Sequence, residues 1–144
     1  MDQVCVTKLF KFEAAHYLPG YEGPCRVMHG HSYKLEVTVS GNIDLKPASS
    51  CTYDSMVLDF SELKEIVQKH IIDKFDHHLI NDIMIEQGDE FITFPYPPTA
   101  EAMVVYFKEV LLKHLPKDIN LESIRLWETD TSYATVYCGG KYGK

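Results

Sequence analysis

The sequence has no closely spaced cysteine pair, no excess of basic charge and no long apolar run. Its four cysteines form no C-x-x-C motif, so a disulfide framework is not expected. The formal net charge of −7 argues against a general nucleic-acid binder, because such proteins need a basic face. No segment approaches the roughly 20 apolar residues that cross a bilayer, and the N-terminus lacks the apolar core of a secretory signal. We therefore expect a cytoplasmic protein without a nucleic-acid or membrane partner.

Internal repeats, low-complexity tracts and linkers are also absent. The chain has 144 residues, of which 45% are hydrophobic and 24% charged. These values are typical of one globular domain with a core of ordinary size. We expect residues 1–144 to form a single domain.

Alternating apolar and polar residues predict two long strands in the first third of the chain. They span residues 4–15 and 33–41, with a loop rich in Gly and Pro over residues 18–24. An extended connection over residues 42–55 leads to a short third strand at 56–59.

Two helices are predicted next. The first begins near Asp59 or Ser61, because Asp59 and Glu62 have the spacing of a capping box. The second begins at Thr99, after two prolines, and ends at Pro116. A final hairpin pairs residues 123–129 with residues 133–138.

The predicted order is β-β-α-α-β-β, with strands and helices segregated along the chain. This pattern favours an α+β fold in which two helices cover one face of an antiparallel sheet. A four-stranded sheet covered on one side leaves its edges open, and association of identical subunits is a common way to close them. The pattern therefore also favours a homo-oligomer.

Three histidines meet the requirements of a metal site. His29 and His31 lie two residues apart at the start of the second strand, so their side chains share a face. His16 ends the neighbouring strand. Three imidazoles without a fourth protein ligand are typical of a catalytic zinc site that keeps one position open. On the residues alone, a chance H-G-H loop and a packed core histidine are equally good explanations.

Other side chains near these histidines are candidates for proton transfer. Cys25 lies four residues before His29, and a thiolate is favoured beside imidazoles and a dication. Asp76 and His77 form a carboxylate–imidazole pair in sequence, although neighbours rarely contact each other, so Asp76 could instead orient another group. The alternatives are an inert loop cysteine and a solvated helix end.

Glu128 departs from the strand pattern around it. It shares the inward parity of Ile124 and Leu126, and an inward carboxylate is costly to bury unless it is paired. A ligand with two adjacent N–H donors, such as the edge of a pterin or guanine ring, would pair with it in bidentate fashion. Alternatively, the strand has already turned to water at this residue.

Taken together, these segments resemble the family of 6-pyruvoyltetrahydropterin synthase and 6-carboxytetrahydropterin synthase. The C-x3-H-G-H spacing resembles the bacterial carboxytetrahydropterin branch, since the animal pyruvoyl branch has a longer gap before H-G-H. The matching segments, in the order of the family, are Phe12 to His16, Cys25 to His31, Met56 to Phe60, Asp76 to Asn81, Pro98 to Glu101 and Glu128-Thr129.

The resemblance implies roles for individual residues. His16, His29 and His31 would bind Zn²⁺. Cys25 would accept a proton, His77 would relay protons with the support of Asp76, Glu128 would anchor the pterin ring or join the relay, and Thr99 would line the pterin pocket.

The resemblance also implies the tunnelling fold, in which subunits join their sheets into a barrel, commonly as a hexamer. The implied reaction is the conversion of 7,8-dihydroneopterin triphosphate to 6-carboxy-5,6,7,8-tetrahydropterin, with release of triphosphate and acetaldehyde, in queuosine biosynthesis. Two alternatives stay open: a pyruvoyltetrahydropterin product, and a zinc module that binds a pterin or purine without turnover.

Overall fold

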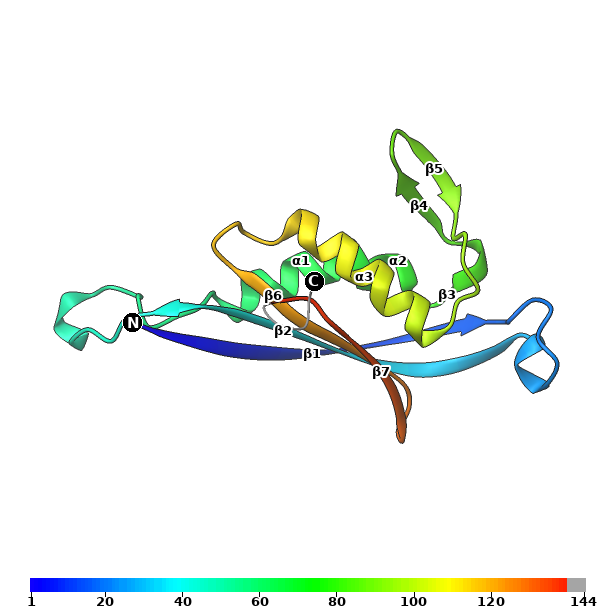
Figure 1. The fold of residues 1–144 in the computed structure, drawn as a ribbon, viewed down its shortest axis with the longest axis horizontal. Helices are drawn as coiled ribbons and strands as arrows, with labels where there is room; N and C mark the ends of the chain where they lie inside the picture. The colour runs from blue at the N-terminus through cyan, green and yellow to red at the C-terminus, as the bar shows by residue number, and fades with distance from the viewer. Residues whose placement is uncertain (140–144) are drawn as a thin grey trace.

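The architecture was analysed in a computed structural model, which describes residues 1–139. A five-stranded sheet carries helices on one face, while its other face is uncovered (Figure 1). The strand order across the sheet is β3-β1-β2-β6-β7. Its strands are β1 (Asp2–His16), β2 (His29–Ile43), β3 (His78–Leu79), β6 (Asn120–Thr129) and β7 (Ser132–Tyr137).

The long hairpin of β1 and β2 forms the centre of the sheet. The two strands pair antiparallel from Asp2 opposite Ile43 to His16 opposite His29. Both strands are longer than the sequence pattern predicted, but the predicted parity is confirmed. Phe12 is buried beneath the helices, whereas its neighbours Lys11 and Glu13 are exposed on the uncovered face.

The helical layer consists of two segments. The first starts with α1 (Phe60–Val67), continues through a π-helical turn η3 (Gln68–Ile72) and ends with α2 (Asp73–Phe75); the second is α3 (Ala100–His114). Each begins with a side-chain cap. The Asp59 carboxylate accepts a hydrogen bond from the Ser61 amide at 2.8 Å, and the Thr99 hydroxyl accepts one from the Ala102 amide at 3.0 Å. The two predicted helices and their starts are confirmed.

An aromatic cluster joins the sheet to the helices. Phe12 of β1 stacks on Tyr33 of β2, with ring centroids 5.0 Å apart and an interplanar angle of 11°. Phe75 of α2 and Phe107 of α3 meet Phe12 edge-on, at 6.2 and 6.4 Å. Offset and edge-on aromatic pairs of this kind each contribute about 0.5–1.5 kcal/mol beyond the area that they bury. The cluster therefore fixes the helices against the end of the sheet where the histidines lie.

The strand predicted at residues 56–59 was wrong. This segment forms turns that lead into α1, and the amide of Met56 donates to the carbonyl of Tyr53 at 3.0 Å. Both edges of β2 are already occupied by β1 and β6. Val57 and Leu58 instead pack their side chains against the core without joining the sheet.

Two elements were not predicted. The short strand β3 pairs parallel with β1, with His78 opposite Ala14, so the sheet is not wholly antiparallel. A separate hairpin of β4 (Met84–Gln87) and β5 (Glu90–Thr93) projects from the body of the molecule (Figure 1). No helix among residues 1–139 is long and apolar enough to cross a membrane.

Candidate metal centre and catalytic site

The three predicted histidine ligands converge at one end of the sheet. His16 is the last residue of β1, and its register partner is His29, the first residue of β2. Their Nε2 atoms lie 3.0 Å apart. One ligand atom from each of His16, His29 and His31 lies within 4.8 Å of the others. The β1–β2 register therefore builds a group of three imidazoles that could hold a metal ion.

Backbone carbonyls orient two of these rings. Nδ1 of His16 lies 2.8 Å from the carbonyl oxygen of Pro98, and Nδ1 of His29 lies 2.7 Å from that of Val27. A carbonyl oxygen only accepts, so each Nδ1 carries the proton and each Nε2 keeps a free lone pair. Backbone support of this kind is the usual means of fixing metal-binding histidines.

His31 completes the group with an unsatisfied nitrogen. Within residues 1–139, its Nε2 is the buried side-chain atom that lacks a hydrogen-bond partner. Burial lowers the pKa of His31; Glu128 raises it, and the nearby His16 and His29 lower it further. A neutral imidazole with an unpaired nitrogen is costly to bury on its own and is the form that binds a metal. The donor set of three imidazoles thus fits Zn²⁺.

Glu128 points at the same nitrogens. Its Oε1 atom lies 3.3 Å from Nε2 of His16 and 3.5 Å from Nε2 of His31. The side chain keeps 31% of its surface exposed, so it reaches both the histidines and solvent. The inward parity predicted for Glu128 agrees with this position.

A cavity of about 460 Å³ adjoins Glu128 at the edge of β7. Glu101 and Tyr133 are among the residues that line it. The sequence analysis gave neither a role, because Glu101 looks like a first-turn helix acid and Tyr133 lies on the uncovered face of a strand. The packing of α3 on β7 brings Glu101 to the cavity, and the pairing of Tyr133 with Trp127 in the β6–β7 hairpin brings Tyr133 beside Glu128.

Asp76 and His77 do contact each other, contrary to the expectation that sequence neighbours rarely pair. Nδ1 of His77 lies 3.0 Å from Oδ1 of Asp76. His77 has a left-handed backbone with a φ of 61°, which turns its side chain back toward Asp76. The same Oδ1 accepts a hydrogen bond from the Glu13 amide at 2.9 Å. The hydrogen bond from the Glu13 amide is the main cause that lowers the pKa of Asp76, and the bond from His77 lowers it further. The Asp76 carboxylate therefore stays ionised.

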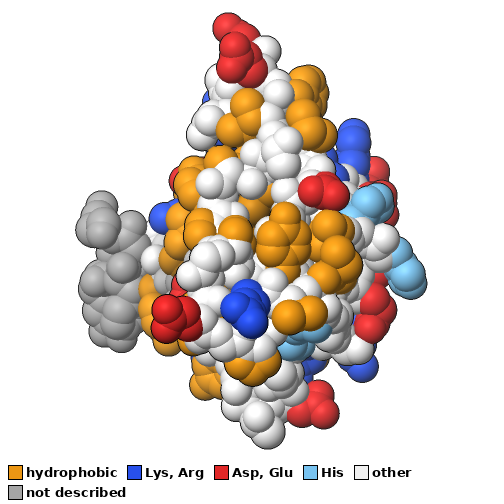
Figure 2. Space-filling model, turned by 90° about the vertical axis from the view of Figure 1, so that its right-hand side faces the viewer, with side chains coloured by type: hydrophobic (Ala, Val, Ile, Leu, Met, Phe, Trp, Pro, Cys, Tyr) orange, Lys and Arg blue, Asp and Glu red, His pale blue; other side chains and the backbone are white. Residues whose placement is uncertain are grey.

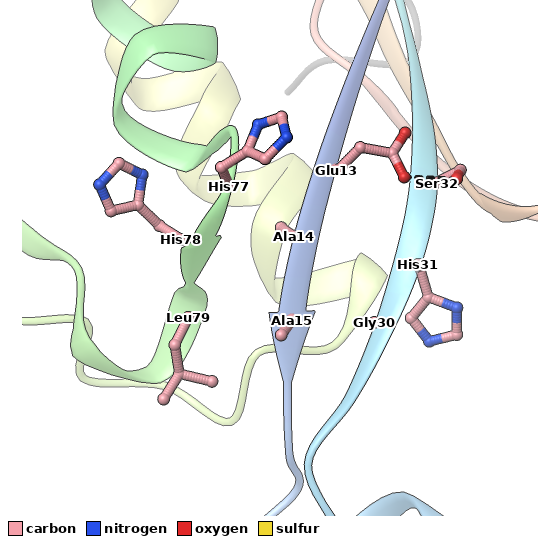
Figure 3. A pocket seen from close by; sticks show the side chains of 9 residues that line it. All are labelled: Glu13, Ala14, Ala15, Gly30, His31, Ser32, His77, His78 and Leu79. Carbon is pink, nitrogen blue, oxygen red and sulfur yellow. Dashed lines mark hydrogen bonds between the residues drawn. The ribbon is translucent and has the colours of Figure 1, made fainter.

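The Asp76–His77 pair is separated from the metal-ligand group. Figure 3 shows His77 beside β1 and His31 beyond β2, with the two strands between them and the His31 ring pointing away. His31 and His77 both border a shallow hollow that is also lined by Glu13 and Gly30. His77 is 77% exposed. The fold of this chain therefore brings together the three histidines and Glu128, but leaves His77 facing outward.

Cys25 and Thr99 lie in the two segments that supply the carbonyls on His29 and His16, and neither lines the cavity beside Glu128. Cys25 is half-buried in a 3₁₀ turn, Pro24–Arg26, within the loop that joins β1 to β2, and its carbonyl accepts from the Leu18 amide at 2.8 Å. Thr99 follows Pro98, whose carbonyl orients His16, and its hydroxyl caps α3. Thr99 directly follows Pro98, and Cys25 lies two residues before Val27, whose carbonyl orients His29.

Comparison with known proteins agrees with this geometry. Residues 5–138 match the family model described as 6-pyruvoyl tetrahydropterin synthase. The chain belongs to this family. The family predicted from the sequence is therefore confirmed.

Members of the 6-pyruvoyl tetrahydropterin synthase family resemble this chain over most of its length. A 6-carboxy-5,6,7,8-tetrahydropterin synthase of Haemophilus influenzae is 38% identical over 139 residues, which cover 89% of this chain and 94% of that protein. One from Synechocystis is 35% identical, covering 92% of each chain. These names agree with the enzyme that the resemblance implied, a 6-carboxytetrahydropterin synthase, which is a carbon–oxygen lyase.

The fold is likewise shared within the family. The 6-pyruvoyl tetrahydropterin synthase of Caenorhabditis elegans superposes with a TM-score of 0.73 at 25% identity, covering 97% of this chain and 98% of that one. An uncharacterized protein from Wolinella succinogenes superposes with a TM-score of 0.75 at 20% identity. The predicted α+β tunnelling fold is confirmed.

Metal removal provides a test of the histidine group. Zinc at 1,000 times its Kd should raise the free energy of unfolding by about 4 kcal/mol, because only the folded chain presents the three nitrogens together. A chelator should therefore lower the midpoint of thermal unfolding of the wild type. His29→Ala should lose this response, while His78→Ala, which alters an exposed histidine of β3, should keep it. An unfolding midpoint that ignores both zinc and chelator would contradict the metal centre.

Proposed function

We propose that residues 1–144 form a single-domain cytoplasmic zinc enzyme that converts 7,8-dihydroneopterin triphosphate to 6-carboxy-5,6,7,8-tetrahydropterin. One water is consumed, triphosphate and acetaldehyde are the other products, and the reaction serves queuosine biosynthesis. The observation that carries the proposal is the convergence of three imidazole nitrogens with the Glu128 carboxylate, 3.3 Å from the nearest of them. Relatives 38% and 35% identical that are named for the carboxytetrahydropterin product support the choice of reaction.

His16, His29 and His31 are the proposed zinc ligands. When bound, zinc supplies Lewis-acid chemistry that makes hydroxyl oxygens of the substrate side chain more acidic. The Pro98 and Val27 carbonyls hold two of the rings in the tautomer that leaves Nε2 free. The reaction reduces the dihydropterin ring to a tetrahydropterin. Since zinc does not change its oxidation state, the electrons have to come from the side chain of the same substrate.

Glu128 is the proposed anchor of the pterin ring. Its carboxylate reaches inward from β6, and a cavity large enough for a bicyclic ring adjoins it at the edge of β7. Two adjacent N–H donors on the pterin would pair with its two oxygens. This contact would fix the ring so that its side chain extends toward the three histidines.

Cys25 and the Asp76–His77 pair are the proposed proton-transfer groups. Cys25 would accept a proton from a side-chain carbon of the substrate as a thiolate. Asp76 holds Nδ1 of His77, so Nε2 of His77 is the atom that would exchange a proton with the substrate. An ionised Asp76 also stabilises the imidazolium that forms when His77 takes up a proton.

A homo-oligomer, which we expect to be a hexamer, is proposed to complete the site. The sheet ends in β7 on one side, and β3 covers only Ala14 and Ala15 at the edge of β1 on the other. Unpaired strand edges favour pairing with a neighbouring sheet. The exposed Asp76–His77 pair lies beside the edge of β1, where a second subunit would approach. The face at the metal-site end is also rich in hydrophobic side chains (Figure 2).

A pyruvoyltetrahydropterin product is the second candidate, since the C. elegans enzyme of that name shares the fold at 25% identity. Both reactions begin with loss of triphosphate, so the products distinguish them. Incubation with 7,8-dihydroneopterin triphosphate should yield acetaldehyde and the mass of the carboxy product. Triphosphate without acetaldehyde would favour the pyruvoyl product, and binding without any product would favour a non-catalytic module.

Cys25→Ala should retain zinc and substrate binding but lower turnover by roughly 10²- to 10⁴-fold, the usual contribution of a general base. A base acts on the barrier and leaves the ground-state complex unchanged. The matched control is Cys5→Ala, which removes an exposed thiol on β1. Near-wild-type turnover of Cys25→Ala would move the base elsewhere, with His77 the next candidate. If Cys25→Ala instead lost its zinc, the result would identify Cys25 as a fourth zinc ligand.

Glu128→Gln should weaken binding of dihydroneopterin by about 2 kcal/mol or more, because one ring donor then faces an amide nitrogen in place of a carboxylate oxygen. Calorimetric titration measures this loss. The control is Glu122→Gln, the same substitution on the same strand, where Glu122 accepts from the Ser40 hydroxyl. Unchanged pterin affinity in Glu128→Gln would refute the anchor role.

Light scattering tests the assembly. The molar mass in solution should be a multiple of the 16.5 kDa subunit, and six subunits are expected. A monomer that persists at micromolar concentration would contradict the proposed closure of the sheet edges.

A further inference from the structure

Two histidines outside the proposed active site stack face to face on the helical layer. The ring centroids of His70 and His114 lie 3.6 Å apart, and the ring planes are inclined by 10°. His70 belongs to the π-helical turn η3, and His114 is the last residue of α3. The sequence pattern gave neither residue a function, because they lie 44 positions apart and belong to different helices.

The pair borders a small hollow with charged walls. Its volume is about 160 Å³, which suits an ion with its bound waters and not a substrate. The carboxylates of Glu86 and Glu109 line it, together with the ammonium groups of Lys74 and Lys113. The two acids offset the two lysines, so the hollow has no net charge that would repel a cation.

His70 is held in the form that can bind a metal. Burial is the main cause that lowers the pKa of His70, and the nearby His114, Lys69 and Lys74 lower it further. At neutral pH the imidazole is therefore uncharged and one ring nitrogen has a free lone pair. His114 is exposed, so its ring has room to turn. A π-helical turn is also a feature that often occurs at functional sites.

We propose that His70 and His114 form a second site for a divalent transition metal, separate from the His16, His29 and His31 group. Two nitrogen ligands of a tetrahedral ion with bonds of about 2.0–2.1 Å lie about 3.3 Å apart. The ring centroids lie 3.6 Å apart, so a turn of the exposed His114 ring can bring one nitrogen of each residue within reach of the same ion. Stacked rings direct their lone pairs in parallel, so the exposed His114 ring turns to aim its nitrogen at the ion. Water completes the coordination, and Glu86 and Glu109, which line the same hollow, supply negative charge near the ion.

The site would connect the two halves of the helical layer. A metal held by His70 and His114 joins η3 to the end of α3 and so adds to the packing of Phe75 on Phe107 between the two helical segments. Because the unfolded chain does not bring these residues together, bound metal stabilises the fold in proportion to the logarithm of its concentration. Imidazole ligands suit Ni²⁺, Cu²⁺ and Zn²⁺.

Titration of the zinc-loaded protein with Ni²⁺ tests the proposal. The wild type should bind one equivalent of Ni²⁺ per chain beyond its zinc, and its thermal unfolding midpoint should rise as Ni²⁺ is added. His114→Gln should weaken this binding by at least about tenfold, since loss of even an outer-shell partner costs 10- to 100-fold. His70→Gln should do the same, and zinc content should not change in either variant. His78→Gln is the matched control, and should bind Ni²⁺ as the wild type does.

Three outcomes would overturn the site. The first is no Ni²⁺ bound beyond the zinc. The second is an additional equivalent that persists in both His114→Gln and His70→Gln. The third is loss of the additional equivalent in His29→Ala, which would assign the Ni²⁺ to the first histidine group. Since His114 is exposed at the end of α3, its substitution keeps the test interpretable even where His70→Gln fails to fold.

Discussion

The pairing register of β1 with β2 is the constraint on which the other features of the site depend. Because His16 faces His29 across the hairpin, two imidazoles from the ends of different strands meet at 3.0 Å, and His31 joins them from the same face. Side chains alternate between faces, so a slip of one residue would carry His16 to the opposite face from its partners. The stack of Phe12 on Tyr33, next to the histidines, resists such a slip, since it buries the same parity on both strands.

The site concentrates polar groups that are costly to bury when unpaired. An orphaned Nε2 on His31 and an inward carboxylate on Glu128 both lie at the end of an otherwise apolar face. Each would be satisfied by a partner that the chain itself does not supply: a cation for the nitrogens, and a pair of N–H donors for the carboxylate. Residues at a functional site commonly break the local rules of the fold in this way, and the surrounding core sustains the cost.

The helical layer contributes to the site mainly through its ends. The start of α3 places the Pro98 carbonyl on His16, and the end of α2 leads into the turn that brings His77 against Asp76. The aromatic packing of Phe75 and Phe107 on Phe12 fixes both helices relative to the sheet. His77 nevertheless lies across β1 and β2 from His31, so the fold of one chain does not bring it to the histidine group (Figure 3).

Periodicity and spacing indicated which side chains face inward, and so predicted the two central strands and both helix starts. They also offered the histidine group and an inward Glu128, each beside an alternative, and the family resemblance favoured these two. The strand and helix predictions depend on the alternation of a strand and on local capping, which short stretches of sequence encode. Tertiary structure decided the rest. Residues 56–59 are no strand because both edges of β2 are taken, and His77 reaches Asp76 only through a left-handed backbone. Glu101 lines the same cavity as Glu128, and His70 stacks on His114, because distant helices and strands pack together. Contacts between residues far apart in the chain depend on how whole elements pack, and no local pattern records that.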